Sequence, residues 1–563
     1  MAHKPSEWLD AVYRMTGLSS RNVNPYVSVR TYLFPTRYWA MQSRVVTLAA
    51  GALLGALASC ATPPRPQTPL SFHPIAETAA PLDRARSDIG FLNRVSWGAS
   101  TSSAQAVAAE GMSKYLGEQL APSNNDELPV DAMAQITQMD IAHNSLSQIN
   151  DVIRGLRDAA QKAKGTPDYD LAQKAYQQKL NDYARQAATR SLLRDLYSRN
   201  QLKEQLTWFW MNHFNVSQNK GEIRAFVGDY EENAIRPHVL GKFHDLLAAT
   251  VFHPAMLQYL DNAQNAVGHI NENYAREIME LHTLGVGSGY SQKDVQELAR
   301  ILTGLGINTS GKIPNVKPEL RSQYRGGNLF EFNPNRHDYG DKVFLGTPIK
   351  GEGLKEVVEA IAILSLEPPT AHFISSELAQ YFCCDAPPES LIDAMAATFR
   401  TSDGDIAAVL KTMFAAPEFR VSLGQKFKDP MHYAISALRA SYGDTVILNA
   451  QPLLGWLNRM GEPLYGHETP DGNPMTAASW SGPGELETRF EIARLVGLGH
   501  SGLFKLPDDK SVEQAPPPQI QQTRYYQVIA PTLGPATTSA LVQPASPTDW
   551  NMLFLSSPEF MHR

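Results

Sequence analysis

The chain has 563 residues, and its 50 Lys and Arg against 57 Asp and Glu give a net charge of −7 at pH 7 with neutral histidines. An acidic chain without a run of basic residues repels phosphate backbones, so we expect no nucleic-acid partner. The three cysteines are Cys60 and the adjacent pair Cys383 and Cys384, too few for a disulfide framework or a four-cysteine zinc site. We expect the adjacent pair to be two buried thiols at a helix end, with a strained vicinal disulfide as the alternative.

The N-terminal part contains a short basic start, an apolar run over residues 45–58 and a Leu-Ala-Ser-Cys lipobox that ends at Cys60. The run is short for a bilayer, so residues 41–59 are predicted to be a lipoprotein signal peptide whose cleavage leaves a lipidated Cys60 on a membrane. The alternative is a buried Ala/Leu helix before an ordinary core cysteine. Because a signal should begin the chain, residues 1–40 are predicted to be an extension upstream of the true start.

Residues 60–82 are predicted to carry the lipid and to form a flexible tether, since they are rich in Pro, Thr and Ala. Ala61 after the cysteine favours, by analogy with other lipoproteins, the outer membrane and its periplasmic face. Beyond the signal, no apolar stretch approaches the ~20 residues of a membrane-spanning helix. The lipid is therefore the expected anchor in the cell envelope.

From Asp83 onward, apolar residues recur at helical spacing nearly everywhere. Over residues 171–196 they lie three to five positions apart in a charged segment, which predicts a long amphipathic helix. Ser291 begins a capping-box pattern, and residues 401–405 can supply the cap of the helix that follows them. Further helices are expected over residues 225–235, 271–284, 293–302, 354–364, 370–382, 406–414 and 486–496. These patterns predict an all-α fold.

Two long irregular stretches interrupt the helices. Residues 307–347 are dense in Gly, Asn and Pro, and one short β-hairpin is expected between residues 343–345 and 348–349. Residues 461–483 are rich in Pro and Gly. Loops this long inside a compact helical body are often lids or binding loops. We therefore expect a helical body with long irregular loops and at most a short β-hairpin.

Residues 202–214 include a Trp-Phe-Trp-Met run and are apolar on all sides, so this helix should be buried together with Asn212 and His213. Buried polar groups need hydrogen-bond partners, which other segments must supply. The preferred interpretation of His213 is a satisfied core histidine that pins two helices together. A catalytic or metal-binding imidazole is the alternative.

The segment 271–284 places Arg276, Glu277 and Glu280 in one polar stripe at about 100° per residue. Paired carboxylates on one face can ligate a metal or share acid–base work. The same residues fit a ladder of ion pairs spaced four apart, and the two interpretations are weighted evenly. His282 lies about 160° from Glu280 around a regular helix, so these two cannot chelate one ion.

His337 and Asp338 are adjacent in the first irregular stretch, where a side chain can project into a cleft. Pairing of Asp338 with Lys342 or Arg336 as loop scaffolding is favoured somewhat over metal ligation. The sequence has neither the Gly-x-Ser-x-Gly pattern nor the His-Glu-x-x-His pattern, which removes two common hydrolase classes.

Three glycines at 285, 287 and 289 resemble a nucleotide-binding fingerprint. They follow a predicted helix instead of a strand, and no Gly-Lys-Ser/Thr is present, so we reject a nucleotide ligand. A tight turn between helices explains them through the positive backbone angles that glycine tolerates.

Several short sequence motifs occur in the same order as in one large bacterial family. They are LNRVSWG at 92–98, WFWMNHF at 208–214, HPAMLQYLDN at 253–262, NENYAREIMELHTLG at 271–285, RHD at 336–338, MGEPL at 460–464 and SPEF at 557–560. The chain resembles the domain-of-unknown-function family 1800 over residues 83–563. This resemblance implies a single helical domain over 83–563, whereas length alone suggests about three domains.

The resemblance brings no activity, but it implies an exported bacterial protein. Members of this family are often encoded beside a second uncharacterised family that is similar to sulfatases and alkaline phosphatases. The resemblance therefore implies a protein partner of that kind. Many relatives have Gly-Gln-Pro where this chain has Gly461-Glu462-Pro463, and the carboxylate calls a neutral hydrogen-bonding role at that position into question.

Two hypotheses of function follow, and the sequence leaves open whether the protein is an enzyme. In the first, it is an envelope enzyme whose site contains His213, Glu277, Glu280, His337 and Asp338 and uses a carboxylate/imidazole pair or a divalent metal such as iron or zinc. In the second, it is a non-catalytic lipoprotein whose buried polar residues lock helices and whose long loops grip a partner. A shared cavity for His213, Glu280 and His337 would favour the first.

Overall fold

The structure is a computed structural model that describes residues 81–123, 126–506, 509, 511, 513, 515 and 517–563. From residue 81 on, these residues fall within one compact unit. The predicted extension at 1–40, the signal peptide at 41–59 and the lipidation site Cys60 lie outside the described residues, so they remain predictions.

Helices make up most of the described chain, which confirms the all-α fold. The α-helices before the strands are α2 (Pro81–Val95), α3 (Thr101–Glu110), α4 (Met112–Leu120), α5 (Val130–Thr137), α6 (Leu146–Ala163), α7 (Tyr169–Tyr197), α8 (Gln201–His213), α9 (Ile223–Asp229), α10 (Phe243–Val251), α11 (Pro254–Tyr259), α12 (Asn273–Glu277) and α13 (Gln292–Ile301). Those after the strands are α14 (Leu354–Leu366), α15 (Pro368–Phe382), α16 (Glu389–Thr401), α17 (Ile406–Ala415), α18 (Pro417–Val421), α19 (Pro430–Tyr442), α20 (Gln451–Arg459), α21 (Ala477–Trp480), α22 (Pro483–Leu498), α23 (Arg524–Ile529), α24 (Pro535–Leu541) and α25 (Pro547–Leu555).

Short 3₁₀ turns join several of these helices, and two π-helical segments extend others. The 3₁₀ turns are η2 (Asp140–Ala142), η4 (Asn262–Gln264), η6 (Pro318–Gln323), η7 (Pro334–Arg336), η8 (Ile520–Gln522) and η9 (Ala530–Thr532). The π-helical segments are η3 (Tyr230–Ile235), which continues α9, and η5 (Ile278–Thr283), which continues α12. π-Helical turns are rare and occur often at functional sites. The expected regular helices over 225–235 and 271–284 are thus each half α and half π.

Local capping explains where several helices begin. Ser291 accepts a hydrogen bond from the Asp294 backbone N–H, and Asp294 accepts one from that of Ser291, which is the predicted capping box. Asp405 accepts a hydrogen bond from the Ala408 backbone N–H at 2.9 Å. Both predicted helix starts are confirmed, because capping depends only on residues close in sequence.

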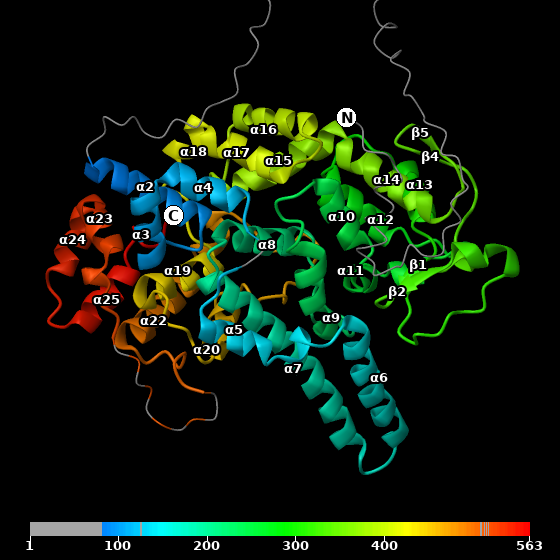
Figure 1. Ribbon diagram of the computed structural model, residues 1–563, viewed down its shortest axis with the longest axis horizontal. Coiled ribbons are helices and arrows are strands. Elements are labelled where there is room, and N and C mark those ends of the chain that lie inside the picture. Colours follow the sequence, from blue (N-terminus) through cyan, green and yellow to red (C-terminus); the bar gives the residue numbers. More distant parts are fainter. Residues whose placement is uncertain are drawn as a thin grey trace, which may run out of the picture. The chain divides into compact units, whose positions relative to one another are not determined.

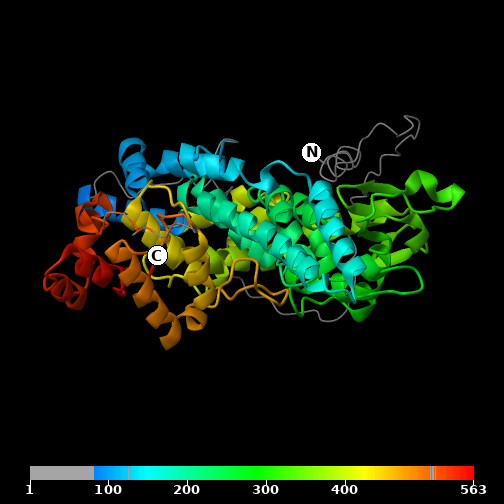
Figure 2. The ribbon, with the colours of Figure 1, turned by 90° about the horizontal axis from the view of Figure 1, so that it is seen from below.

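The ends of the described chain pack together. Helix α2, the first described helix, packs against α23, and Figures 1 and 2 both show the two side by side. Helices α6 and α7 form an antiparallel pair, and α7 contains the predicted amphipathic segment. The core therefore brings α2 and α23 into contact although most of the sequence lies between them.

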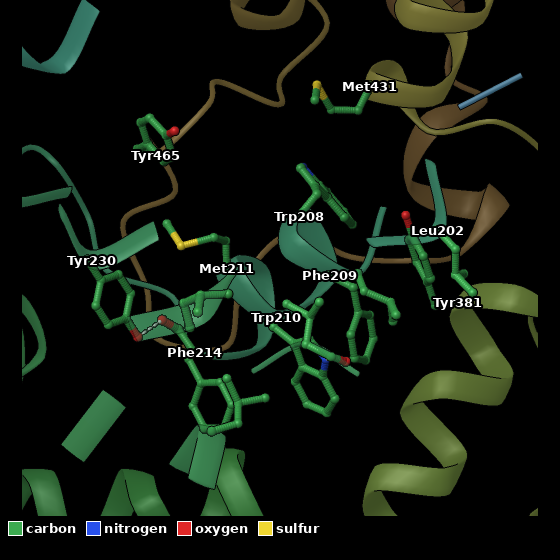
Figure 3. Close-up of a cluster of buried hydrophobic side chains, with 14 of the residues drawn as sticks. Leu202, Trp208, Phe209, Trp210, Met211, Phe214, Tyr230, Tyr381, Met431 and Tyr465 are labelled. Carbon is green, nitrogen blue, oxygen red and sulfur yellow. Dashed lines mark hydrogen bonds between the residues drawn. The ribbon is translucent and has the colours of Figure 1, made fainter. Parts of the chain in front are cut away.

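The core around α8 is built from aromatic side chains, as its sequence predicts. Trp208, Phe209, Trp210 and Phe214 are all buried, and Tyr381 of α15 stacks on Trp208 with ring centroids 5.6 Å apart. Figure 3 shows this cluster, in which the Tyr230 hydroxyl of η3 donates to the backbone oxygen of Phe214 at 2.9 Å. Because α8 is buried on all sides, its polar residues Asn212 and His213 are buried with it.

Two small antiparallel sheets lie between α13 and α14. The expected hairpin is present as β4 (Lys342–Phe344) paired with β5 (Thr347–Ile349). A second sheet goes beyond the expectation of at most a short hairpin: β1 (Leu305–Ile307), β3 (Phe330–Phe332) and β2 (Arg325–Gly327) pair in that order. Three-residue strands are too short to show the alternation that predicts a strand.

None of the described helices is by itself both long enough and apolar enough to cross a bilayer. Taken together, α14 and α15 meet the criterion, but they are bent by 63° where they join.

Candidate active site

The end of α8 carries the side chains that position the candidate site. Trp208, Met211 and Asn212 lie at helical spacing on one side of α8, and together with Asn215 just after the helix they line a hollow against the loop of residues 461–474, which is part of the second irregular stretch. The Asn212 amide donates to the Asn473 backbone oxygen at 2.9 Å and accepts from the Asn473 N–H at 2.6 Å. The sequence predicted a buried Asn212 with a partner from another segment, and this is confirmed.

Further amides hold the 461–474 loop against the turn after α8. Asn215 donates to the backbone oxygens of Thr469 at 2.7 Å and His467 at 3.2 Å. The Tyr259 hydroxyl of α11 donates to the backbone oxygen of Glu468 at 2.6 Å. These contacts satisfy loop carbonyls that would otherwise be desolvated, so the loop has a defined path over α8.

A small hollow lies between α8 and this loop. It is lined by Trp208, Met211, Asn212, Asn215 and Val216 on one side and by residues 462–465, His467 and Asn473 on the other. We call it the α8 hollow.

Glu462 is the most unusual residue in the wall of the α8 hollow. Its side chain is buried, with 2% of the residue exposed; one oxygen accepts from the Met431 N–H at 2.9 Å, and the other has no partner among the described residues. Burial, and next the charge of Asp429, raise the pKa of Glu462 well above its usual value. Burial therefore favours the uncharged acid, which has the shape and polarity of the glutamine that the family resemblance leads us to expect at this position. The sequence analysis called a neutral hydrogen-bonding role at position 462 into question. An uncharged Glu462 is compatible with that role.

Glu277 and Glu280 lie where α12 passes into η5. Glu280 and Glu272 both approach Arg276, at 3.5 and 3.3 Å, so the predicted ladder of ion pairs is present. Glu277 is half-buried and accepts no hydrogen bond within the described part of the chain. Its pKa is raised, first by burial and then by Glu280, with a smaller contribution from Asp471 of the loop, while Arg276 opposes the shift.

The Tyr259 hydroxyl lies at the rim of the α8 hollow and within electrostatic range of Glu277. It interacts with the Asn215 side chain, and the charges of Asp471 and Glu277 act on it. Burial, the main cause, raises the pKa of Tyr259 to about 12. Glu277 and Asp471 therefore both lie within electrostatic range of the Tyr259 hydroxyl.

His213 does not face this region but lies in an aromatic box. Its ring is near those of Phe209, Phe214 and Phe373, and Nε2 donates to the His282 backbone oxygen at 3.2 Å. Burial lowers the pKa of His213 to about 4, so the ring is neutral.

His282, on the buried side of η5, is a second enclosed imidazole. Its Nε2 has no partner among the described residues, and burial lowers its pKa well below the usual value. His282 is buried whereas Glu280 is partly exposed, and both lie in the π-helical η5 instead of the regular helix that was expected.

His337 belongs to a separate buried network. Its Nδ1 faces the Thr303 backbone oxygen at 2.8 Å and its Nε2 faces Glu356 at 2.8 Å. Lys342 pairs with the second oxygen of Glu356, and all three charged or ionisable side chains of this network are fully buried. Both ring nitrogens of His337 thus already face acceptors within the fold.

Asp338 serves as loop scaffolding with a different partner from those expected. Arg300 of α13 contacts its two oxygens at 2.9 and 3.1 Å, where Lys342 or Arg336 was predicted. Lys342 touches only its backbone oxygen. The hydrogen bond from Arg300 lowers the pKa of Asp338. Arg300 is 38 residues away from Asp338 in the sequence, so no local pattern indicated this pairing.

The five predicted residues therefore do not form one chelating set. Among the described residues, the only group of three or more His, Cys, Asp or Glu side chains with ligand atoms within 4.8 Å of one another is His372, Glu389 and Asp393. His372 Nε2 lies 2.7 Å from Glu389, and all three side chains are exposed. Glu389 and Asp393 are four residues apart on α16, so the sequence could show that they share a helix face. Only the fold shows that His372 of α15 lies beside them.

Comparison with known proteins identifies a family only. The family model described as "Protein of unknown function (DUF1800)" matches residues 90–562. Neither a curated protein nor a solved structure matches the chain.

Proposed function

Because the chain belongs to the DUF1800 family, whose description assigns no activity, we propose its function from the candidate site. The protein is an exported envelope lipoprotein, anchored through Cys60 to the outer membrane, and it performs acid–base catalysis with Glu277 as the proton-transferring group. The lipobox supports the anchoring, and the surroundings of Glu277 support the chemistry.

The single observation that carries the catalytic proposal is a half-buried carboxyl without a hydrogen-bond partner. A general acid or base must be free to meet the substrate, and its pKa should lie nearer to the working pH than that of an exposed glutamate. Glu277 meets both conditions, because burial and Glu280 raise its pKa and no described group occupies its oxygens. The charges of Glu280 and Asp471 favour an uncharged or cationic substrate over an anionic one.

The proposed chemistry uses no imidazole, since His213 and His337 are engaged elsewhere in the fold. That same observation favours a second candidate function, a non-catalytic lipoprotein whose buried polar residues lock helices. In that case the 461–474 loop would be a binding surface for a sulfatase- or phosphatase-like partner.

The catalytic proposal is tested by turnover of a panel of chromogenic esters, glycosides, phosphate esters and peptides by the purified chain. Glu277→Gln should lower any turnover by about 100-fold or more, the scale of general acid–base catalysis. Glu272→Gln, at the residue just before the same helix and already paired with Arg276, is the matched control and should leave turnover unchanged. Turnover that survives Glu277→Gln would reject the catalytic role.

The anchoring proposal is tested separately by membrane fractionation. Cys60→Ser should abolish lipidation and leave the signal uncleaved, because lipoprotein processing requires the lipidated cysteine, so the protein should accumulate at its unprocessed mass. Deletion of residues 1–40 should leave export and lipidation intact. Membrane association of the Cys60→Ser variant at the normal processed mass would contradict the anchor.

A further inference from the structure

We propose that His372, Glu389 and Asp393 bind a zinc ion between helices α15 and α16. None of the three residues lines the α8 hollow or acts on the charge of Glu277. This inference therefore goes beyond the proton transfer proposed for Glu277 and does not depend on it.

Two helices that pack against each other supply the three side chains. His372 lies one turn into α15, and Glu389 and Asp393 are four residues apart at the start of α16, so the two carboxylates share one face of that helix. Helices α15 and α16 are in contact, and Figure 1 shows them beside each other. One nitrogen of His372 and one oxygen of each carboxylate all lie within 4.8 Å of one another. Helix packing thus gathers three metal-ligating side chains at one point.

The two carboxylates lack a cationic side chain. Among the described residues, the partner of Glu389 is the His372 imidazole, at 2.7 Å, and Asp393 has neither a hydrogen bond nor an ion pair. Two carboxylates this close repel each other, and a bound cation would replace the repulsion by attraction. All three side chains are exposed, so an ion reaches the ligand atoms directly from solvent.

The imidazole decides which cation fits. A pair of exposed carboxylates alone would suit calcium or magnesium, which take oxygen ligands, whereas an imidazole nitrogen favours zinc and other first-row transition metals. Zinc accepts one nitrogen and two carboxylate oxygens, and a water molecule can complete its tetrahedron. We therefore assign zinc with three protein ligands and one position open to solvent.

The ligand atoms need only small movements to reach zinc geometry. Two atoms about 2.1 Å from a tetrahedral zinc ion lie about 3.4 Å apart. The separation of His372 Nε2 and Glu389, now 2.7 Å, must widen slightly, and the other separations must contract from at most 4.8 Å. The zinc ion takes the place of the proton in the His372–Glu389 hydrogen bond, and that proton leaves to solvent when the ion binds.

The test is a calorimetric titration of the purified full chain, without an affinity tag and freed of metal by a chelator, with zinc chloride. One zinc ion per chain should bind. At a hundredfold excess over Kd, Tm should rise by about 2–3 °C, because the ion binds the folded chain and the unfolding entropy of the whole unit is large. Calcium chloride at the same concentration should produce neither effect.

Two variants each remove one ligand. His372→Gln and Asp393→Asn should each weaken zinc binding by about tenfold or more, since loss of a direct ligand costs at least as much as loss of a group that supports one. Both side chains are exposed, so the Tm of each metal-free variant should stay within about 1 °C of the parent and show that the variant is folded.

Three control variants report where the ion binds. His143→Gln removes an exposed histidine between α5 and α6, and Glu487→Gln removes an exposed carboxylate of α22. Cys384→Ser removes the less buried thiol of the adjacent cysteine pair, which is the other group in this region that zinc prefers. Each control should bind zinc within about twofold of the parent.

Four results would overturn the inference. They are the absence of saturable heat with zinc; parent-like affinity in either His372→Gln or Asp393→Asn; a loss of affinity in Cys384→Ser, which would place the ion on the thiols; and calcium binding as tight as zinc binding, which would indicate an acidic patch only. Glu277→Gln should bind zinc like the parent, so failure of the catalytic proposal is distinguishable from failure of this one.

Discussion

The buried network around Glu356 allows a quantitative test of the structural role assigned to His337. Glu356→Gln removes one negative charge and leaves the Lys342 ammonium in the interior without a carboxylate. The Gln side chain can still accept from His337 and from the Gly353 N–H, which lies 2.9 Å from Glu356, so shape is conserved. Removing one partner of a buried ion pair costs about 3–5 kcal/mol.

This cost converts to a shift in melting temperature. About 480 residues are described, and an unfolding entropy of about 2.1 cal/mol/K per residue gives roughly 1 kcal/mol/K for the whole unit. Glu356→Gln should therefore lower Tm by about 3–5 °C, and equilibrium guanidinium unfolding followed by tryptophan fluorescence should give a matching loss of free energy.

Glu352→Gln is the matched control one turn earlier in the chain. Glu352 pairs with Lys355 at 3.0 Å, but their side chains are 55% and 62% exposed, so solvent screening limits the loss to below about 1 kcal/mol. If both variants lose the same small amount, the network contributes no more than a surface pair. The claim that His337 has a structural role would then be refuted, and its catalytic role would be open again.

Three other predictions concern local environments. Because burial lowers the pKa of His213 to about 4 from about 6.5 in the unfolded chain, stability should be lost as pH falls from 6.5 to 4, by about 3 kcal/mol, and His213→Phe should remove that part of the slope in pH-dependent unfolding. Asn215→Ala removes two hydrogen bonds to the 461–474 loop, so hydrogen exchange should speed up in that loop while global stability falls by only about 1–2 kcal/mol; unchanged exchange would contradict the anchoring. Burial and the neighbouring Cys383 raise the pKa of the Cys384 thiol to about 11, so alkylation at pH 8 should be roughly 100-fold slower in the folded chain than in guanidinium, and equal rates would show an open site.

Much of the helical architecture could be predicted from the sequence, because its signals are local. The capping box at Ser291 and the cap at Asp405 use residues three positions apart, and the apolar character of residues 202–214 correctly placed that helix in the core. The strands β1, β2 and β3 were not predicted, since three residues carry no periodicity. The π-helical register of η5 depends on packing and has no sequence signature here.

The candidate site also has features that the sequence predicts locally and features that depend on packing. The polar stripe containing Glu277 and Glu280 was visible in the sequence, but the difference between them, one unpartnered and one in an ion pair, appears only when the surrounding segments are placed. The sequence marks Glu462 only as a carboxyl where the family resemblance leads us to expect an amide. Its burial, which decides its charge, comes from α8 and α19, distant in the chain.

The sequence by itself therefore determined which segments form helices, which helix is enclosed and which residues carry chemistry. The tertiary structure alone decided how those residues are used: Asn212 meets Asn473 across 261 positions, and His337 is committed to Glu356 instead of to a shared site with His213. The physical reason is that helix periodicity and capping act over a few residues, whereas desolvation and hydrogen-bond pairing depend on which distant surfaces the packed core brings into contact.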